Sequence, residues 1–150
     1  MGRSMEGTLM HTLSIRQPWA WLITSGLKDV ENRTWFSPYR GPLLIHAGKA
    51  LDPDLKTREA LADMLAFMEL ELDGPIPDPA QLPRGGIVGS AYMTGCVSDN
   101  ASDWFCGPFG FKLEHAKEIP FRPCKGALGF FQVDLEALPE GPAALPIGFK

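Results

Sequence analysis

Glycine and proline occur throughout the chain and divide its hydrophobic sequence into short runs. The 150 residues include 16 glycines and 14 prolines. Proline interrupts helices and interior strands, and glycine favours turns. This pattern predicts many short elements joined by turns, in preference to a few long helices. Hydrophobic residues make up 45% of the chain and charged residues 21%, which is typical of a single globular domain with a core of its own.

Alternating hydrophobic and polar residues predict five or six strands. We expect them within residues 8–16, 30–35, 42–48, 86–97, 103–113 and 125–135. The stretch between the last two, residues 114–124, is predicted to be a loop or a short helix. Small residues at the centre of the fourth strand, Gly89, Ser90 and Ala91, indicate that a helix or a ligand packs close to its backbone.

Two segments have the features of helices. In residues 17–26, Pro18 suits a first helical position and Gly26 suits a left-handed end. In residues 51–74, Asp52 is the predicted cap and Pro53 fits the first turn. The longer helix has an acidic face and one apolar stripe, formed by Leu61, Met64, Leu65, Met68 and Leu72.

These elements predict an α+β fold, a small, partly closed β-barrel of five to six strands flanked by helices. The proline-rich residues 75–83 are expected to form an extended surface connection. We divide the chain into a flexible N-terminal tail at 1–10, the domain at 11–135, and a C-terminal extension at 136–150 that packs on the domain or trails it.

Charge is unevenly distributed along this acidic chain. The net charge of -4 argues against a protein that coats nucleic acid through bulk positive charge. Residues 11–50, however, hold five basic and two acidic residues, whereas residues 51–80 hold eight acidic and two basic ones. The first region can therefore form a local anion site. No signal-peptide h-region and no run of 18 apolar residues is found, so we expect a cytoplasmic protein that does not enter membranes.

Metal and cofactor chemistry has no support in the sequence. The three cysteines, Cys96, Cys106 and Cys124, are widely spaced and form no CxxC pair. We expect them to be reduced and mostly buried. The three histidines follow no metal-binding spacing, and the glycines of residues 84–89 lack the ending of a phosphate-binding loop. We therefore predict no metal and no cofactor.

The segment "SIRQPWAWLITSGLKDVENRTW" resembles the opening signature of the ASCH superfamily, G-x-K-x-x-E-x-R after a helix that often begins with Gln-Pro. Gly26, Lys28, Glu31 and Arg33 match all four positions. Weaker similarity continues to about residue 135. The resemblance implies a PUA-like fold associated with RNA and modified nucleotides, and it carries over Lys28 as a catalytic residue. Some relatives hydrolyse acylated cytidine nucleosides and others cut or bind nucleic acid. In the amidohydrolase branch a threonine stands at the position of Glu31, so binding and metal-independent hydrolysis both remain open.

The chemistry of Lys28, Glu31 and Arg33 suits a nucleotide or RNA. On a strand, Glu31 and Arg33 share one face. Arg33 can hold a phosphate or carbonyl, Glu31 can relay a proton or accept from an amine, and Lys28 can stabilise an anion. The preceding helix end and Glu31 both favour a charged Lys28. In the alternative interpretation, Lys28 caps helix carbonyls and an exposed Glu31–Arg33 pair contributes only about 0 to 1 kcal/mol.

Further ligand-binding candidates come from nearby cations, aromatics and polar residues: Arg16, Gln17, Trp21, Trp35, His46, Lys49 and Ser90. Most aromatics in this region are expected to be core, with Trp21 and Trp35 the exceptions because they lie off the predicted apolar faces. For His46 a buried, hydrogen-bonded side chain is the alternative. A protein-interaction module that uses the acidic helix at residues 53–72 is a separate possibility.

Overall fold

The computed structural model describes residues 8–141. Residues 1–7 of the predicted N-terminal tail and residues 142–150 of the predicted C-terminal extension lie outside the described part. Leu9 and Met10, placed in the tail by the sequence, belong to the first strand.

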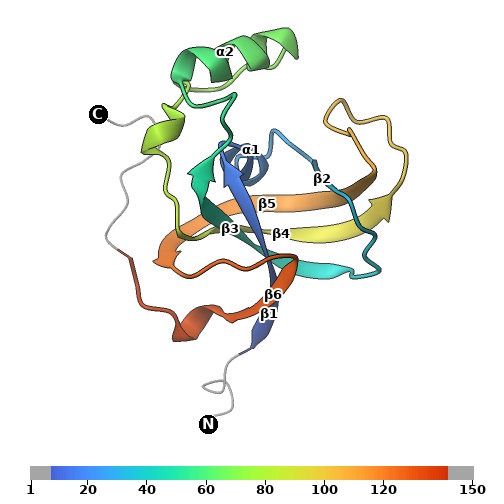
Figure 1. Cartoon of the computed structure of the whole chain (residues 1–150), viewed down its shortest axis with the longest axis vertical. Helices are drawn as coiled ribbons and strands as arrows, with labels where there is room; N and C mark the ends of the chain where they lie inside the picture. The colour runs from blue at the N-terminus through green and yellow to red at the C-terminus, as the bar shows by residue number, and fades with distance from the viewer. Residues whose placement is uncertain (1–7, 142–150) are drawn as a thin grey trace.

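Six strands form one mixed sheet (Figure 1). They are β1 (Leu9–Gln17), β2 (Val30–Arg33), β3 (Gly41–Leu51), β4 (Gly86–Val97), β5 (Phe109–Pro123) and β6 (Phe130–Asp134). Their order is β2-β5-β4-β3-β1-β6, with β1 and β3 parallel and every other pair antiparallel. The predicted α+β, PUA-like fold is confirmed. The sheet curls without closing, because β2 and β6 are its two ends.

Two helices cover one end of the curled sheet. Helix α1 (Trp19–Thr24) buries Ala20 and Ile23 against the strands. Helix α2 (Arg58–Phe67) lies beyond α1 at the top of Figure 1 and buries Leu61 and Leu65 in a second hydrophobic cluster. Short 3-10 turns lie at Pro79–Gln81, within the proline-rich connection, and at Leu135–Ala137. Among residues 8–141, no helix has the length and apolar character needed to cross a bilayer.

The second helix is shorter than predicted. It begins at Arg58, with the Thr57 hydroxyl accepting a hydrogen bond from the Ala60 amide, and it ends at Phe67. Asp52 is therefore not its cap. The Asp52 carboxylate accepts hydrogen bonds from the Trp19 indole and the Asp54 amide instead, in the turn that follows β3. The five residues of the predicted apolar stripe all pack in one hydrophobic cluster, although the last of them, Leu72, lies beyond the end of the helix.

Residues 114–123, predicted as a loop or short helix, are part of strand β5. Their charged side chains concealed the strand: Lys117 and Glu118 pair with Ser90 and Gly89 of β4 while their side chains remain exposed. His115 has a positive φ of 56°, and the β4–β5 register shifts on either side of this region. The strand bends here and so follows the curl of the sheet. Conversely, residues 103–108 form a loop, and β5 begins at Phe109.

The small residues at the centre of β4 accommodate helix α1. A Cβ atom at Gly89 would lie 2.4 Å from Thr24 Cγ2 and 2.5 Å from the Lys117 carbonyl oxygen. The backbone of β4 therefore touches the end of α1 directly, and the helix explains the small residue there. This contact fixes α1, and with it the turn that leads into β2.

Replacing Gly89 with alanine should destabilise the domain by about 1 to 3 kcal/mol, because the added methyl group forces the helix or the β5 backbone to move. Urea unfolding measures the change. Gly74→Ala is the matched control, since a Cβ atom there meets nothing within 4 Å. Equal stability of the two variants would contradict the close contact.

Candidate ligand-binding cleft

The turn after α1 holds Lys28 in place. Gly26 adopts a φ of 87° and ends the helix, as predicted, and its amide donates to the Ile23 carbonyl. The Lys28 amide then donates to the Leu22 carbonyl at 2.9 Å. At the other end of the helix, the Gln17 side chain accepts a hydrogen bond from the Trp21 amide. The backbone of Lys28 is thus fixed by hydrogen bonds within the helix-to-strand connection.

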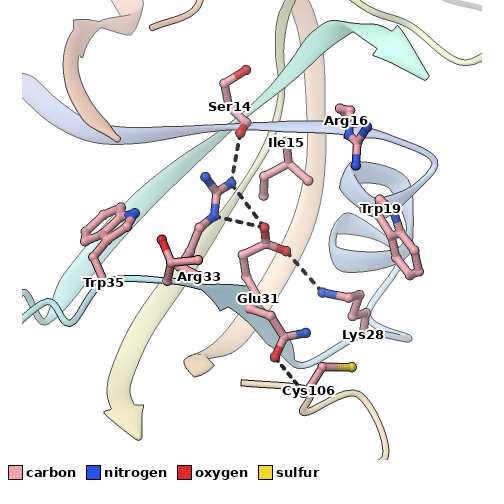
Figure 2. Close-up of a pocket in the computed structure, with 11 residues that line it drawn as sticks. Ser14, Ile15, Arg16, Trp19, Lys28, Glu31, Arg33, Trp35 and Cys106 are labelled. Carbon is pink, nitrogen blue, oxygen red and sulfur yellow. Dashed lines mark hydrogen bonds and ion pairs between the residues drawn. The ribbon is translucent and has the colours of Figure 1, made fainter. Parts of the chain in front are cut away.

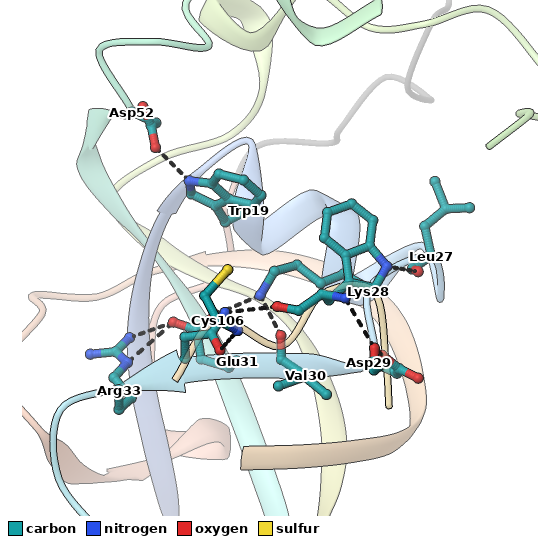
Figure 3. A network of polar contacts seen from close by, with 12 residues as sticks. Trp19, Leu27, Lys28, Asp29, Val30, Glu31, Arg33, Asp52 and Cys106 are labelled. Atoms are coloured by element: carbon teal, nitrogen blue, oxygen red, sulfur yellow. Dashed lines mark hydrogen bonds and ion pairs between the residues drawn. The ribbon is translucent and has the colours of Figure 1, made fainter. Parts of the chain in front are cut away.

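Lys28, Glu31 and Arg33 form one buried ionic network (Figure 3). Lys28 Nζ lies 3.1 Å from Glu31 Oε1 and also donates to the Val30 carbonyl. Arg33 Nε and Nη2 each lie 3.1 Å from Glu31 Oε2. The side chains of Lys28 and Glu31 are only 4% and 11% exposed. The shared strand face of Glu31 and Arg33 agrees with the prediction, whereas an exposed surface pair and a lysine bound to helix carbonyls are not what the structure has.

The network lines a cavity of about 570 Å³ between β1, α1 and β2. Figure 2 shows Lys28, Glu31 and Arg33 along one side and Ser14, Ile15 and Arg16 of β1 along the other. The remaining lining residues are Trp19, Asn32, Thr34, Trp35 and Cys106. We call this cavity the cleft.

Arg33 joins the end strand β2 to β1 across the open side of the sheet. Its Nη2 atom donates to the Ser14 carbonyl oxygen at 3.0 Å. Strand β6 covers that edge of β1 only as far as Leu13, which pairs with Phe130. The Ser14 carbonyl is therefore the first β1 group beyond β6, and a side chain takes the place of a strand there.

Arg33 retains a donor that the described residues do not use. Arg33 Nη1 makes no hydrogen bond to residues 8–141, and Figure 2 shows it on the Trp35 side of the cleft. Lys28 Nζ has two hydrogen-bond partners, and the Trp19 ring lies beside it. Both Glu31 oxygens are occupied by cations. The cleft therefore offers positive charge and donors, and it suits a ligand that supplies acceptor oxygens.

Aromatic side chains flank the network at both ends. The Trp19 ring lies 5.6 Å from Lys28 Nζ, a cation–π contact, and its indole donates to Asp52 at 2.7 Å. Trp35 is held by edge contacts to Phe111 and Phe130. Trp19 was assigned to the core from the sequence, but it both packs against the core and lines the cleft.

Asn32 holds the loop that forms the remaining wall. Its side chain donates to the Trp104 carbonyl and accepts hydrogen bonds from the Cys106 and Gly107 amides. This brings Cys106, an exposed free cysteine, to the cleft. The three cysteines are unpaired, but the expectation that they are mostly buried is wrong: Cys96 and Cys124 are half-buried and Cys106 is exposed. Nothing in the sequence spacing connects Asn32 to a loop more than 70 residues away.

Arg16 and Trp35 line the cleft with the ionic network, whereas Gln17 and Trp21 do not line it. Arg16 is at the rim, 3.9 Å from Asp52, with 54% of its side chain exposed. Gln17 is buried and bonds to the Pro83 carbonyl and the Trp21 amide. Trp21 faces the second hydrophobic cluster, because α2 covers the side of α1 that an isolated helix would leave open.

His46, Lys49 and Ser90 lie away from the cleft. His46 Nε2 donates to the Cys124 carbonyl at 2.7 Å, so its Nδ1 accepts from the Ser14 hydroxyl at 2.8 Å. It is a buried, satisfied histidine. Lys49 is exposed on β3 beside Gly85, and Ser90 is half-buried in the β3–β4 ladder.

Comparison with known proteins agrees with the sequence signature. The ASCH domain family matches residues 13–120, a range that contains the ionic network and most of the sheet. The chain belongs to the ASCH family. The family is associated with RNA binding.

Two similar proteins are both described as activating signal cointegrator 1. The human protein is 29% identical over 131 residues, which cover 81% of this chain and 22% of the relative. The mouse protein is 34% identical over 87 residues, which cover 57% of this chain and 14% of the relative. The chain therefore spans less than a quarter of the length of either relative.

Replacing Glu31 with glutamine should lower the free energy of unfolding by about 3 kcal/mol, because it leaves two cations, one of them 4% exposed, without their carboxylate. Urea unfolding measures the loss. Glu118→Gln, an exposed acid on β5, should change stability little. A small effect of both substitutions would show that the network contributes nothing to the fold.

Acidification should destabilise the domain through His46. Burial lowers the pKa of His46 below 6.5, against the opposing effect of its hydrogen bond to Cys124. The folded state therefore favours the neutral ring, and its stabilising contribution, complete above pH 6.5, is lost as the pH falls below that value. Melting temperatures from pH 8 to pH 5 should show a decline that His46→Gln reduces.

His115→Asn is the control for this experiment, since His115 is exposed and asparagine tolerates its positive φ. It should keep the wild-type pH dependence. An unchanged pH dependence in the His46 variant would assign the acid sensitivity to other groups.

Proposed function

We propose that this ASCH domain binds RNA, or a modified nucleoside or nucleotide, in the cleft formed by Lys28, Glu31 and Arg33. The observation that carries the proposal is the cationic lining of the cavity: Arg33 Nη1 makes no hydrogen bond within residues 8–141, Lys28 lies beside it, and both oxygens of the Glu31 carboxylate that they share are already paired. Phosphate and base carbonyl oxygens are acceptors of the matching kind. Trp19 and Trp35 supply flat apolar surfaces beside these donors, as base recognition requires.

The roles of the three residues differ. Lys28 and Arg33 contact the ligand. Glu31 is a positioning residue, because both of its oxygens hold the cations at fixed places and neither remains to accept from a ligand amine. This arrangement supports binding over hydrolysis, since Lys28 Nζ already donates to the Glu31 carboxylate and to the Val30 carbonyl and so serves as a hydrogen-bond donor.

Substituting either Lys28 or Arg33 should weaken binding at least tenfold, the usual order for a lost charge-assisted hydrogen bond. Fluorescence anisotropy with a labelled single-stranded RNA, and calorimetry with cytidine monophosphate, measure it for Lys28→Met and for Arg33→Lys. The second variant keeps the charge and removes the forked donors. Lys56→Met, an exposed lysine outside the cleft, is the charge-matched control and should bind as the wild type does.

Unfolding curves accompany each variant, so that a loss of fold is not taken for a loss of contact. Wild-type affinity in both cleft variants would contradict the proposal. Incubation with acylated nucleosides and short RNAs in EDTA tests hydrolysis in the same samples. Turnover that depends on Lys28 would assign the cleft to a metal-independent hydrolase, and retention of a protein partner with no RNA at low salt would favour an interaction module.

A further inference from the structure

Two phenylalanine rings pack together beside residues that line the cleft. Phe36 and Phe109 meet edge to face, with ring centroids 6.0 Å apart and an interplanar angle of 70°. Phe36 is 55% exposed. It follows Thr34 and Trp35, which line the cleft, and Phe109 pairs with Arg33 in the β2–β5 ladder. We call these two side chains the aromatic pair. It adjoins the cleft through both the chain and the sheet.

The loop that carries Phe36 is held by hydrogen bonds. The Ser37 amide contacts Cys96 Sγ, and the Tyr39 amide donates to the Ser37 hydroxyl. Arg40 Nη1 donates to the Ser37 and Tyr39 carbonyls. A single exposed apolar side chain needs no explanation. An exposed ring on an ordered loop, in contact with a second ring and next to a cationic cavity, is a feature that a ligand can use.

Charge distinguishes which partner the aromatic pair fits. Arg40, an exposed cation, lies on the loop that carries Phe36, and residues 32–41 contain no acidic residue. A polyanion is therefore attracted to this part of the surface. Phe67 is a useful contrast: it is 87% exposed at the end of α2, but the next residues include Glu69, Glu71 and Asp73. An exposed phenylalanine in that acidic setting does not suit a nucleic acid.

We propose that the aromatic pair is a stacking platform for a second nucleobase, next to the one held in the cleft, so that the domain binds single-stranded nucleic acid over at least two nucleotides. The proposal rests on the proposed function of the cleft and extends it. Stacking on aromatic rings contributes to affinity with little dependence on base identity. The platform should therefore add affinity for a strand without adding sequence preference.

The experiment compares a mononucleotide with a hexanucleotide. Phe36→Ala should weaken binding of a single-stranded hexanucleotide about tenfold and leave binding of cytidine monophosphate unchanged. Phe36→Leu, which keeps the apolar volume without the ring, should behave in the same way. Phe67→Ala is the matched control and should change neither affinity. RNA and DNA hexanucleotides are both measured, because stacking acts on either.

Phe109→Leu gives a second reading from the other ring, with an unfolding curve to show that β5 is intact. The stacking proposal is overturned if Phe36→Ala binds the hexanucleotide like Phe67→Ala, or if it weakens mononucleotide and hexanucleotide equally, which would make Phe36 a support for the cleft. In either result the proposed function still stands if the wild-type domain binds and Lys28→Met does not. A wild-type domain that binds neither ligand refutes both proposals.

Discussion

A carboxylate shared by a buried and a half-buried cation connects the parts of this domain. Glu31 holds Lys28 from the helix-to-strand turn on one oxygen and Arg33 on the other, and Arg33 continues to the Ser14 carbonyl of β1. The helix end, the end strand β2 and the far side of the curled sheet are thereby tied at one place. Burying three charges is unfavourable unless each is paired. The network meets that condition, since within the described residues every buried side-chain nitrogen and oxygen has a hydrogen-bond partner.

The same network explains how an acidic protein can carry a local excess of positive charge. One glutamate and two cations leave a net positive charge in a partly enclosed hollow, where solvent screens charge less than on an open surface. The acidic residues gather instead in and after α2, which Figure 1 places beyond α1. The protein as a whole is therefore negatively charged, whereas the partly enclosed cleft carries a local positive charge.

Local patterns in the sequence were sufficient to predict much of the fold. Alternation identified all six strands, and the period of two placed Glu31 and Arg33 on one face. The errors came where tertiary contacts override local preference. Residues 114–123 look like a loop because of their charges, yet the backbone of β4 pairs with them. Asp52 and Pro53 look like a helix start, but Asp52 bonds to the Trp19 indole.

For the candidate site too, local sequence patterns predicted the residues that are close in the chain, and contacts between distant segments were missed. Residues close in sequence, such as Lys28, Glu31 and Arg33, were grouped correctly. The sequence predicts Trp21 in the binding site and Trp19 in the core, whereas Trp19 lines the cleft and Trp21 is buried. The sequence does not reveal that α2 covers the outer side of α1. Asn32 and Cys106 meet only in the folded chain, through a loop that no spacing rule connects.

Strands β2 and β1 are joined by a side-chain hydrogen bond and not by a backbone ladder. Backbone ladder hydrogen bonds form with almost any residue type. The bond from Arg33 to Ser14, in contrast, requires a guanidinium on a side chain of this length. We expect substitution at position 33 to alter both the width of the opening and the chemistry inside it, because the Arg33 side chain makes these contacts and takes no part in the five strand pairings. In a fold of this kind, a single substitution can change the chemistry of the cleft without changing the arrangement of the strands.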